Sequence, residues 1–142
     1  MTESEAIAAA WCDSYLRAFN DGDVDRISAH WAFPALILSG GQRYVYKSAD
    51  QFRRNTSGLL SFYSDQGVAH AERTCVAVVS FSEDEIAFRA EDRFYGEEGA
   101  LMAHWQAGYV LQRDAADWRA ILASAEGEAA AWRARGTPLP GT

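Results

Sequence analysis

The sequence predicts an α+β domain in which helices come first and a curved sheet follows. Two helical patterns flank the corner at residues 20–23 (NDGD), and the second pattern stops at Phe33-Pro34. Beyond Val68, four strand-like segments are joined by short turns. Short links between sequential strands favour antiparallel neighbours. Helices followed by a run of strands are typical of the α+β class.

Composition and charge describe one domain, spanning residues 1–142, and exclude several classes of partner. The chain is 49% hydrophobic and 13% aromatic, which is enough to form a core. Thirteen Lys and Arg against twenty Asp and Glu give a net charge of −7, which disfavours nucleic acid. The acidic start MTESEAIAAAW does not resemble a signal peptide, and no apolar run has membrane-spanning length. We therefore expect a cytoplasmic protein that binds no membrane.

The first helix is expected from about Glu3 to Asn20, because apolar side chains recur along it at three- and four-residue steps. Asp23 then caps a short second helix. This helix ends at Phe33-Pro34, since the residue before a proline avoids helical geometry. Its inward side chains should be Val24, Ile27 and Trp31.

A hairpin and a third helix come next. Residues 34–39 (PALILS) are typical of a buried strand, and residues 43–47 (RYVYK) form its return strand after a glycine-containing turn. Ser48 with Gln51 fits a capping box that begins the third helix, and Gly67 ends it.

The remaining chain predicts a meander and a C-terminal extension. The four strands are expected at residues 70–81, 85–95, 100–113 and 118–124. Residues 125–142 form the extension, with a short helix over residues 125–135 and a flexible tail, because Pro138 and Pro140 cannot continue a helix. A lone tryptophan here, Trp132, most often packs on its own domain, but it can also cover a pocket or reach a partner.

The corner from Tyr15 to Trp31 (YLRAFNDGDVDRISAHW) resembles the pattern Y-x-x-A-x-N-x-G-D-x-D of the nuclear transport factor two-like superfamily, in particular its SnoaL-like bacterial members. The strand order and the ending at residues 118–121 (WRAI) are also similar. The resemblance covers residues 5–125. It implies a cystatin-like cone, in which a bent mixed or antiparallel sheet packs on three N-terminal helices, and often a homodimer through the sheet. Isomerases, dehydratases and non-enzymes share this fold, so the fold does not give the function.

One activity within this superfamily, ketosteroid isomerisation, does not fit the sequence. Such an enzyme needs a carboxylate base and an oxyanion hole made of a phenol and a protonated acid. Tyr15 matches the position of the family's oxyanion-hole tyrosine. The position of the base falls on Ser39, and that of the second acid falls near Ala107. Tyr15 remains a candidate hydrogen-bond donor, or equally a core tyrosine whose hydroxyl has one partner.

Asp92 is the first catalytic candidate. It shares one face of a predicted strand with four apolar residues, Ile86, Phe88, Ala90 and Phe94. A carboxylate on such a face is paired, reaches solvent, or lies in a polar cavity, where it can act as a general acid or base. The structural alternative is a strand-end position or an ion pair with Arg43, Arg73 or Arg113.

His70 is the second candidate. SnoaL-like dehydratases similar to scytalone dehydratase carry a catalytic histidine near this position, and a histidine can move a proton near neutral pH. The second histidine of that enzyme has no match, because Tyr95 and Gly96 stand there. The alternative is a surface histidine at the end of a strand.

The aromatic residues expected to line the interior suit a flat apolar ligand: Trp11, Trp31, Phe88, Phe94, Trp105 and Tyr109. Cys12 and Cys75 are isolated, and no paired-histidine spacing occurs, so we expect neither a metal nor a cofactor.

Three hypotheses remain open. In the first, the protein is a dehydratase or isomerase in which Asp92 or His70 moves a proton and Tyr15 donates a hydrogen bond. In the second, it is a non-enzymatic binding or dimerisation module. The third, an adaptor acting through the outer sheet face, is weaker. A cavity containing Tyr15 and Asp92 together favours the first hypothesis, and a filled interior favours the second.

Overall fold

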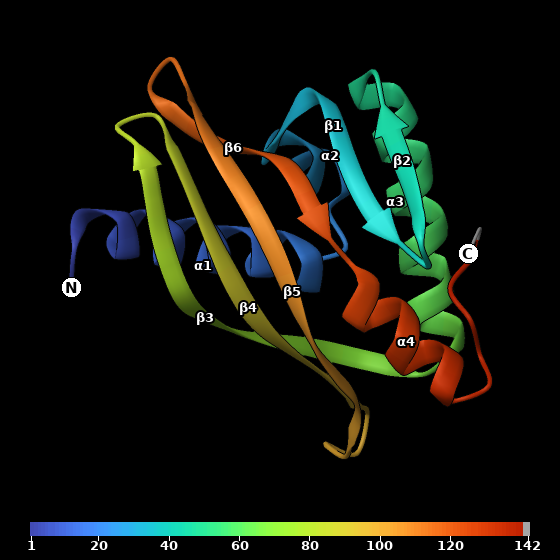
Figure 1. The fold of residues 1–142 in the computed structure, drawn as a ribbon. Helices are drawn as coiled ribbons and strands as arrows, with labels where there is room; N and C mark the ends of the chain where they lie inside the picture. The colour runs from blue at the N-terminus through green and yellow to red at the C-terminus, as the bar shows by residue number, and fades with distance from the viewer. Residues whose placement is uncertain (141–142) are drawn as a thin grey trace.

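A six-stranded mixed sheet organises the structure, a computed structural model that describes residues 1–140 (Figure 1). The spatial order of the strands is β2-β1-β6-β5-β4-β3. Neighbouring strands are antiparallel except β1 and β6, which pair in parallel. The strands are β1 (Trp31–Ser39), β2 (Gln42–Tyr46), β3 (Val68–Ser82), β4 (Glu85–Gly96), β5 (Leu101–Asp114) and β6 (Asp117–Ser124).

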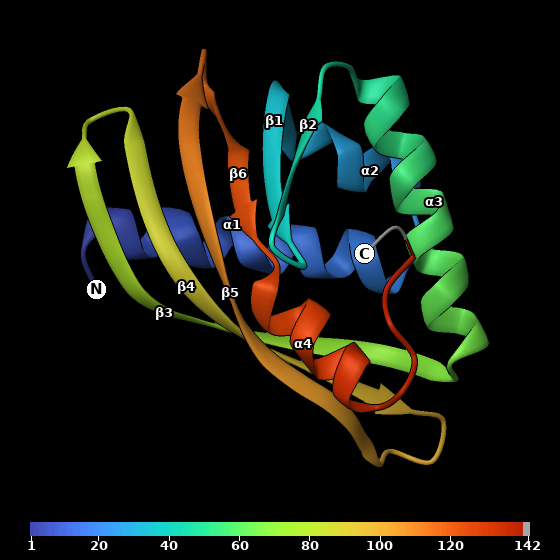
Figure 2. The same cartoon turned by 45° about the vertical axis from the view of Figure 1, so that its right-hand side comes forward.

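The helices cover the hollow side of this sheet and its lower end. They are α1 (Glu3–Asn20), α2 (Val24–Ala29), α3 (Ala49–Asp65) and α4 (Glu126–Ala134). The long strands β3, β4 and β5 bend along their length, and α1 crosses behind them while α3 stands beside the β1–β2 hairpin (Figures 1 and 2). The α+β class and the bent sheet predicted from the sequence are therefore confirmed.

Local signals in the sequence set the helix starts. The Asp23 side chain accepts a hydrogen bond from the backbone N–H of Arg26 (3.1 Å), which caps α2. The Ser48 hydroxyl accepts one from Gln51 N–H (3.2 Å), as expected for α3. The Gln51 side chain, however, accepts its bond from Lys47 N–H (2.9 Å), one residue earlier than a standard capping box requires.

The prediction that Trp31 lies on the second helix is wrong. α2 ends at Ala29, and Trp31 begins β1, three residues before Pro34. The partner strand explains the early change, since Trp31 pairs with Ala120 of β6 and the Ala120 N–H donates to the His30 carbonyl (2.8 Å). Trp31 still points inward and is almost fully buried.

Alternating burial along the central strands follows the sequence pattern. On β4 the predicted inward residues Ile86, Phe88, Ala90, Asp92 and Phe94 are all buried. On β5 the buried set runs from Ala103 to Leu111 in steps of two, whereas Leu101 remains 51% exposed at the strand end. These two faces, together with α1 and α3, form the interior of the cone.

The C-terminal extension packs on the domain. The expected short helix is α4, and Trp132 on it is completely buried. Leu139 beyond it is also buried. The tail is predicted to run to Thr142, and residues 141–142 lie outside the part that the structure describes.

Two further observations concern residues 1–140 as a whole. None of the helices in this range has the length and apolar character needed to cross a membrane. Cys12 is buried, Cys75 is half-buried, and both are free thiols.

Candidate functional site

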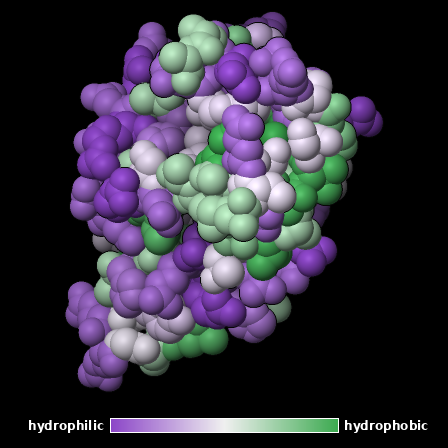
Figure 3. Space-filling model, turned by 90° about the vertical axis from the view of Figure 1, so that its left-hand side faces the viewer, coloured by the Kyte–Doolittle hydropathy of each residue, from purple (hydrophilic) through white to green (hydrophobic). Residues whose placement is uncertain are grey.

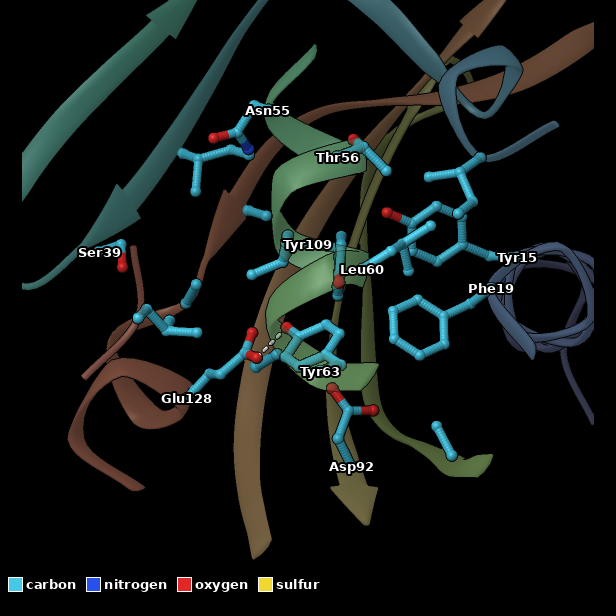
Figure 4. Close-up of a pocket in the computed structure, with 18 of the residues that line it drawn as sticks. Tyr15, Phe19, Ser39, Asn55, Thr56, Leu60, Tyr63, Asp92, Tyr109 and Glu128 are labelled. Atoms are coloured by element: carbon cyan, nitrogen blue, oxygen red, sulfur yellow. Dashed lines mark hydrogen bonds between the residues drawn. The ribbon is translucent and has the colours of Figure 1, made fainter. Parts of the chain in front are cut away.

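A cavity of about 210 Å³ lies between the helices and the hollow face of the sheet. All six strands contribute to its wall, as do α1, α3, α4 and the tail residue Leu139. Its surface is mostly apolar and aromatic, with a few polar groups directed inward (Figure 4). Tyr15 and Asp92 both line it, which is the arrangement that the first hypothesis requires.

Four of the six aromatic residues predicted to line the interior do so: Trp31, Phe94, Trp105 and Tyr109. Trp11 and Phe88 instead lie one layer behind the wall. The Trp11 ring stacks on Tyr15 with centroids 4.7 Å apart, and the Phe88 ring stacks on Tyr109 at 5.4 Å. They support two wall residues and do not face the cavity themselves, because the helix and strand bring a second aromatic ring in front of each.

Tyr15 enters the cavity from α1 (Figure 4). Its hydroxyl oxygen accepts a hydrogen bond from Trp31 Nε1 (3.2 Å), so the hydroxyl hydrogen is left to donate. Burial raises the pKa of Tyr15, and the group therefore stays protonated at neutral pH. A protonated phenol with an N–H bonded to its oxygen is a suitable donor to an oxygen that gains negative charge.

Asp92 forms an ion pair with Arg73, which faces it across the β3–β4 ladder. Arg73 Nε donates to Asp92 Oδ1 (2.6 Å) and Nη2 donates to Oδ2 (2.8 Å). The two side chains are only 9% and 7% exposed. This pairing corresponds to the structural alternative given above, with Arg73 as the partner. Because both carboxylate oxygens accept bonds from a permanent cation, Asp92 is poorly placed to take a proton from a ligand.

His70 does not line the cavity. It is exposed on β3, and its ring stacks on Tyr95 with centroids 5.0 Å apart. The next residues explain this position, since Ala71 and Arg73 point inward and strand alternation turns His70 outward. The structure therefore brings Tyr15 and Asp92 together and leaves His70 outside.

Glu128 is a site residue that sequence reasoning missed. It projects from α4 into the cavity, where its carboxylate accepts hydrogen bonds from the Tyr63 hydroxyl and from Trp132 Nε1 (3.2 Å; Figure 4). Burial raises the pKa of Glu128 to about 7 against the opposing Tyr63 hydrogen bond, and the nearby charge of Asp92 adds to the rise. Glu128 can therefore accept or release a proton near neutral pH.

The packing of α4 explains why the sequence pattern contains little indication of Glu128. A Cβ atom at Gly127 would lie 2.5 Å from the carbonyl oxygen of Gln106, so only glycine lets α4 approach β5 this closely. The one local signal is the spacing of Glu128 and Trp132, four residues apart and hence on one helix face. Which way that face points is decided by β5, about twenty residues earlier in the chain.

Ser39 and Ala107 both line the cavity. These are the positions where the resemblance to ketosteroid isomerases places a base and a second acid. Neither side chain can ionise in the required range, so that mechanism has no support here. Within residues 1–140, no three His, Cys, Asp or Glu side chains gather in a way that could hold a metal ion.

Comparisons with known proteins agree with this architecture. The family model described as NTF2-like protein (DUF6841) matches residues 3–128. A search of curated proteins finds no match.

Three solved structures share this fold at low sequence identity to the chain. A ketosteroid isomerase-like protein from Erwinia carotovora atroseptica superposes with a TM-score of 0.66 at 19% identity, covering 87% of this chain and 95% of that one. An NTF-2 like protein of unknown function from Shewanella oneidensis gives 0.68 at 10% identity, covering 84% and 96%. A domain of unknown function with a cystatin-like fold from Nostoc punctiforme gives 0.68 at 12% identity, covering 87% and 76%. At these identities the likeness concerns the fold alone. Since the family model covers most of the chain, the protein belongs to the NTF2-like superfamily, in the family DUF6841.

Proposed function

We propose that the cavity binds a small apolar organic molecule and moves a proton on it without a cofactor, as in an isomerisation or a dehydration. The observation that carries the proposal is Glu128, a carboxyl group with a pKa of about 7 that faces a largely aromatic cavity. It takes the role that the sequence suggested for Asp92 or His70. A general base is most effective when its pKa lies near the working pH.

The geometry supports a division of roles. Ionised Glu128 removes a proton from a carbon of the ligand, and the Tyr15 hydroxyl donates a hydrogen bond to the ligand oxygen on which negative charge develops. The proton held by Glu128 then returns to another atom of the same ligand or helps a hydroxyl group to leave. Tyr63 and Trp132 hold the carboxylate in place through their hydrogen bonds.

Proton exchange on a simple ketone tests this proposal. In D₂O, we expect the wild-type protein to accelerate deuterium incorporation into the methyl group of acetophenone, followed by proton NMR. Glu128→Gln should lower this rate by roughly 100-fold or more, since a positioned general base contributes about that much. Tyr15→Phe should also lower it. Glu98→Gln is the matched control, because Glu98 is exposed in the turn between β4 and β5.

A non-enzymatic binding module is the second candidate. The observation that favours it is the ion pair of Asp92, because Arg73 occupies both oxygens of this predicted catalytic carboxylate. Under this alternative, acetophenone binds but Glu128→Gln leaves its exchange rate at the wild-type value. That result would rule out Glu128 as the base.

A further inference from the structure

We propose that Arg73 is a ligand-binding residue, and that its Nη1 donates a hydrogen bond to an uncharged oxygen of the ligand, such as a ketone or ester carbonyl. This inference rests on the proposed use of the cavity to bind a small molecule, and it names the chemical class of that molecule. It also gives Arg73 a role beyond neutralising Asp92.

The hydrogen bonds that Arg73 makes within residues 1–140 leave one of its nitrogens, Nη1, unused. Nε and Nη2 bond to Asp92, and Nη2 also donates to the Tyr109 hydroxyl (2.9 Å). Nη1 is buried and has no hydrogen-bond partner within residues 1–140. Because Nη1 lies on the edge opposite Nε, the Asp92 carboxylate cannot reach it. A buried charged donor without an acceptor is rare and calls for a partner.

The Arg73 side chain belongs to the wall of the ligand site. Arg73 lines the cavity, and its side chain is 91% buried, as the 9% exposed fraction shows. Its Cζ lies 4.7 Å from the centre of the Tyr109 ring and 5.7 Å from that of Tyr15. Both rings belong to the cavity wall. The guanidinium group therefore lies near Tyr15, the donor in the proposed reaction, and we place the ligand oxygen within reach of both.

The charged groups around the cavity favour an uncharged oxygen on the ligand. The charge of Arg73 is already balanced by Asp92. A carboxylate ligand would place a further negative charge in a cavity that holds Asp92 and Glu128, at a large desolvation cost. An ammonium ligand has no lone pair with which to accept the Nη1 hydrogen bond. A neutral acceptor satisfies Nη1 without either penalty.

Three small molecules of nearly equal shape test the inference on the unaltered protein. Acetophenone carries a carbonyl oxygen, α-methylstyrene replaces that oxygen by a methylene group, and benzoate replaces the acetyl group by a carboxylate. Binding is measured at pH 8 by titration with ¹H–¹⁵N NMR. We expect acetophenone to bind about tenfold or more tightly than α-methylstyrene, the effect of one hydrogen bond to a charged donor. Benzoate should bind most weakly.

Variants separate Arg73 from Tyr15 as the source of this preference. Arg73→Gln combined with Asp92→Asn removes both charges together and should abolish the preference for acetophenone over α-methylstyrene. The control Arg93→Gln, on the exposed side of the sheet, should keep it. If the double variant keeps the preference while Tyr15→Phe loses it, Tyr15 alone binds the oxygen and the inference is overturned.

The ligand comparison can overturn the inference even if the double variant does not fold. Equal binding of acetophenone and α-methylstyrene to the wild-type protein would overturn the role of Arg73 and leave the proposed binding function intact. Failure of all three molecules to bind would instead contradict the proposed function itself. Tightest binding by benzoate would show that Arg73 recognises anions, against the charge argument.

Discussion

At the scale of single residues, burial and partners decide what each ionisable group in the cavity can do. Asp92 and Glu128 are both carboxylates in the same cavity, but Asp92 faces a guanidinium group and Glu128 faces a phenol and an indole. Both oxygens of Asp92 are bonded to a permanent cation, whereas burial raises the pKa of Glu128 to about 7, so that Glu128 can titrate near neutral pH. Two identical functional groups therefore acquire different roles.

Glu128 should make stability depend on pH. Its pKa rises from 4.5 to about 7 on folding, so the folded state holds a proton that the unfolded chain releases between these values. The free energy of unfolding should therefore fall as the pH rises from about 4.5 to 7, by up to about 3 kcal/mol. In Glu128→Gln this fall should disappear, and the variant should be the more stable protein at pH 8.

Urea unfolding at pH 5, 6, 7 and 8 checks this expectation. The exposed Glu98→Gln variant is the control and should follow the wild-type curve. Parallel pH profiles for wild type and Glu128→Gln would show that the pKa of Glu128 is not raised.

Asp92 should prove essential to stability whether or not it takes part in a reaction. Asp92→Asn leaves the Arg73 charge buried without a counter-ion, which costs about 3 kcal/mol or more. Replacing both members, as in Arg73→Met with Asp92→Leu, should recover much of this loss because no unpaired charge remains. Chemical unfolding of Arg73→Met, Asp92→Leu and the double variant measures the coupling; additive losses would contradict it.

At the scale of elements, the contact between α4 and β5 positions the site. α4 packs against β5 (Figures 1 and 2) and brings Glu128 to the cavity, with Trp132 bonded to it from behind the wall. Gly127 allows the helix to lie directly against the backbone of Gln106. The Glu126 side chain adds a second attachment, since it accepts a hydrogen bond from Gly41 N–H (2.9 Å) at the β1–β2 turn.

Two Gly→Ala substitutions should have opposite effects. At Gly127 the added methyl group meets backbone at 2.5 Å, so the helix must move, and we expect a loss of roughly 1–3 kcal/mol, typical of overpacking. At Gly58 in α3 nothing lies within 4 Å, and alanine should raise stability by about 0.5–1 kcal/mol through its helix propensity. Thermal unfolding compares them; a neutral Gly127→Ala would show that α4 is not tightly docked.

At the scale of the whole molecule, the sheet has one face toward the cavity and one face outward. A register shift between Val76 and Val79, where Ala77 has a φ of 53°, lets Val78 pack on the core while Val79 and Phe81 remain 50% and 65% exposed. Exposed apolar side chains in a group are typical of contact surfaces. On the side of the molecule drawn in Figure 3, hydrophobic side chains gather mainly in the centre and right-hand part, next to hydrophilic ones, and a smaller hydrophobic area lies at the bottom.

We propose that this outer face forms a homodimer, as the resemblance to the superfamily implies. Light scattering after size exclusion should give twice the mass of the chain. Val79→Lys with Phe81→Lys should lower it to one chain mass, because charges oppose burial of that face. Val45→Lys, on the edge strand β2 and 52% exposed, is the control and should leave the mass unchanged. A wild-type protein that is monomeric at every concentration would end this proposal.

The sequence by itself determined the fold and the positions of two polar cavity residues, Tyr15 and Asp92. Helix periodicity, capping residues and strand alternation are local properties, and they suffice to place Tyr15 on α1 and Asp92 on the inward face of β4. Side chains also alternate along β3, so His70 points outward because Arg73, three residues later, points inward. The change of Trp31 from helix to strand could not be seen locally, because its pairing partner in β6 is far away in the chain.

Only the tertiary structure decided which of these groups can act. It selected Arg73 from three possible arginines as the partner of Asp92, and it left Nη1 of that arginine without an acceptor among residues 1–140. It also buried Glu128 in the cavity beside Tyr63, 65 residues away in the chain, and this burial raises the pKa of the Glu128 carboxyl group. Protonation and pairing depend on neighbours through space and on the water they exclude, whereas the sequence pattern reports only neighbours along the chain.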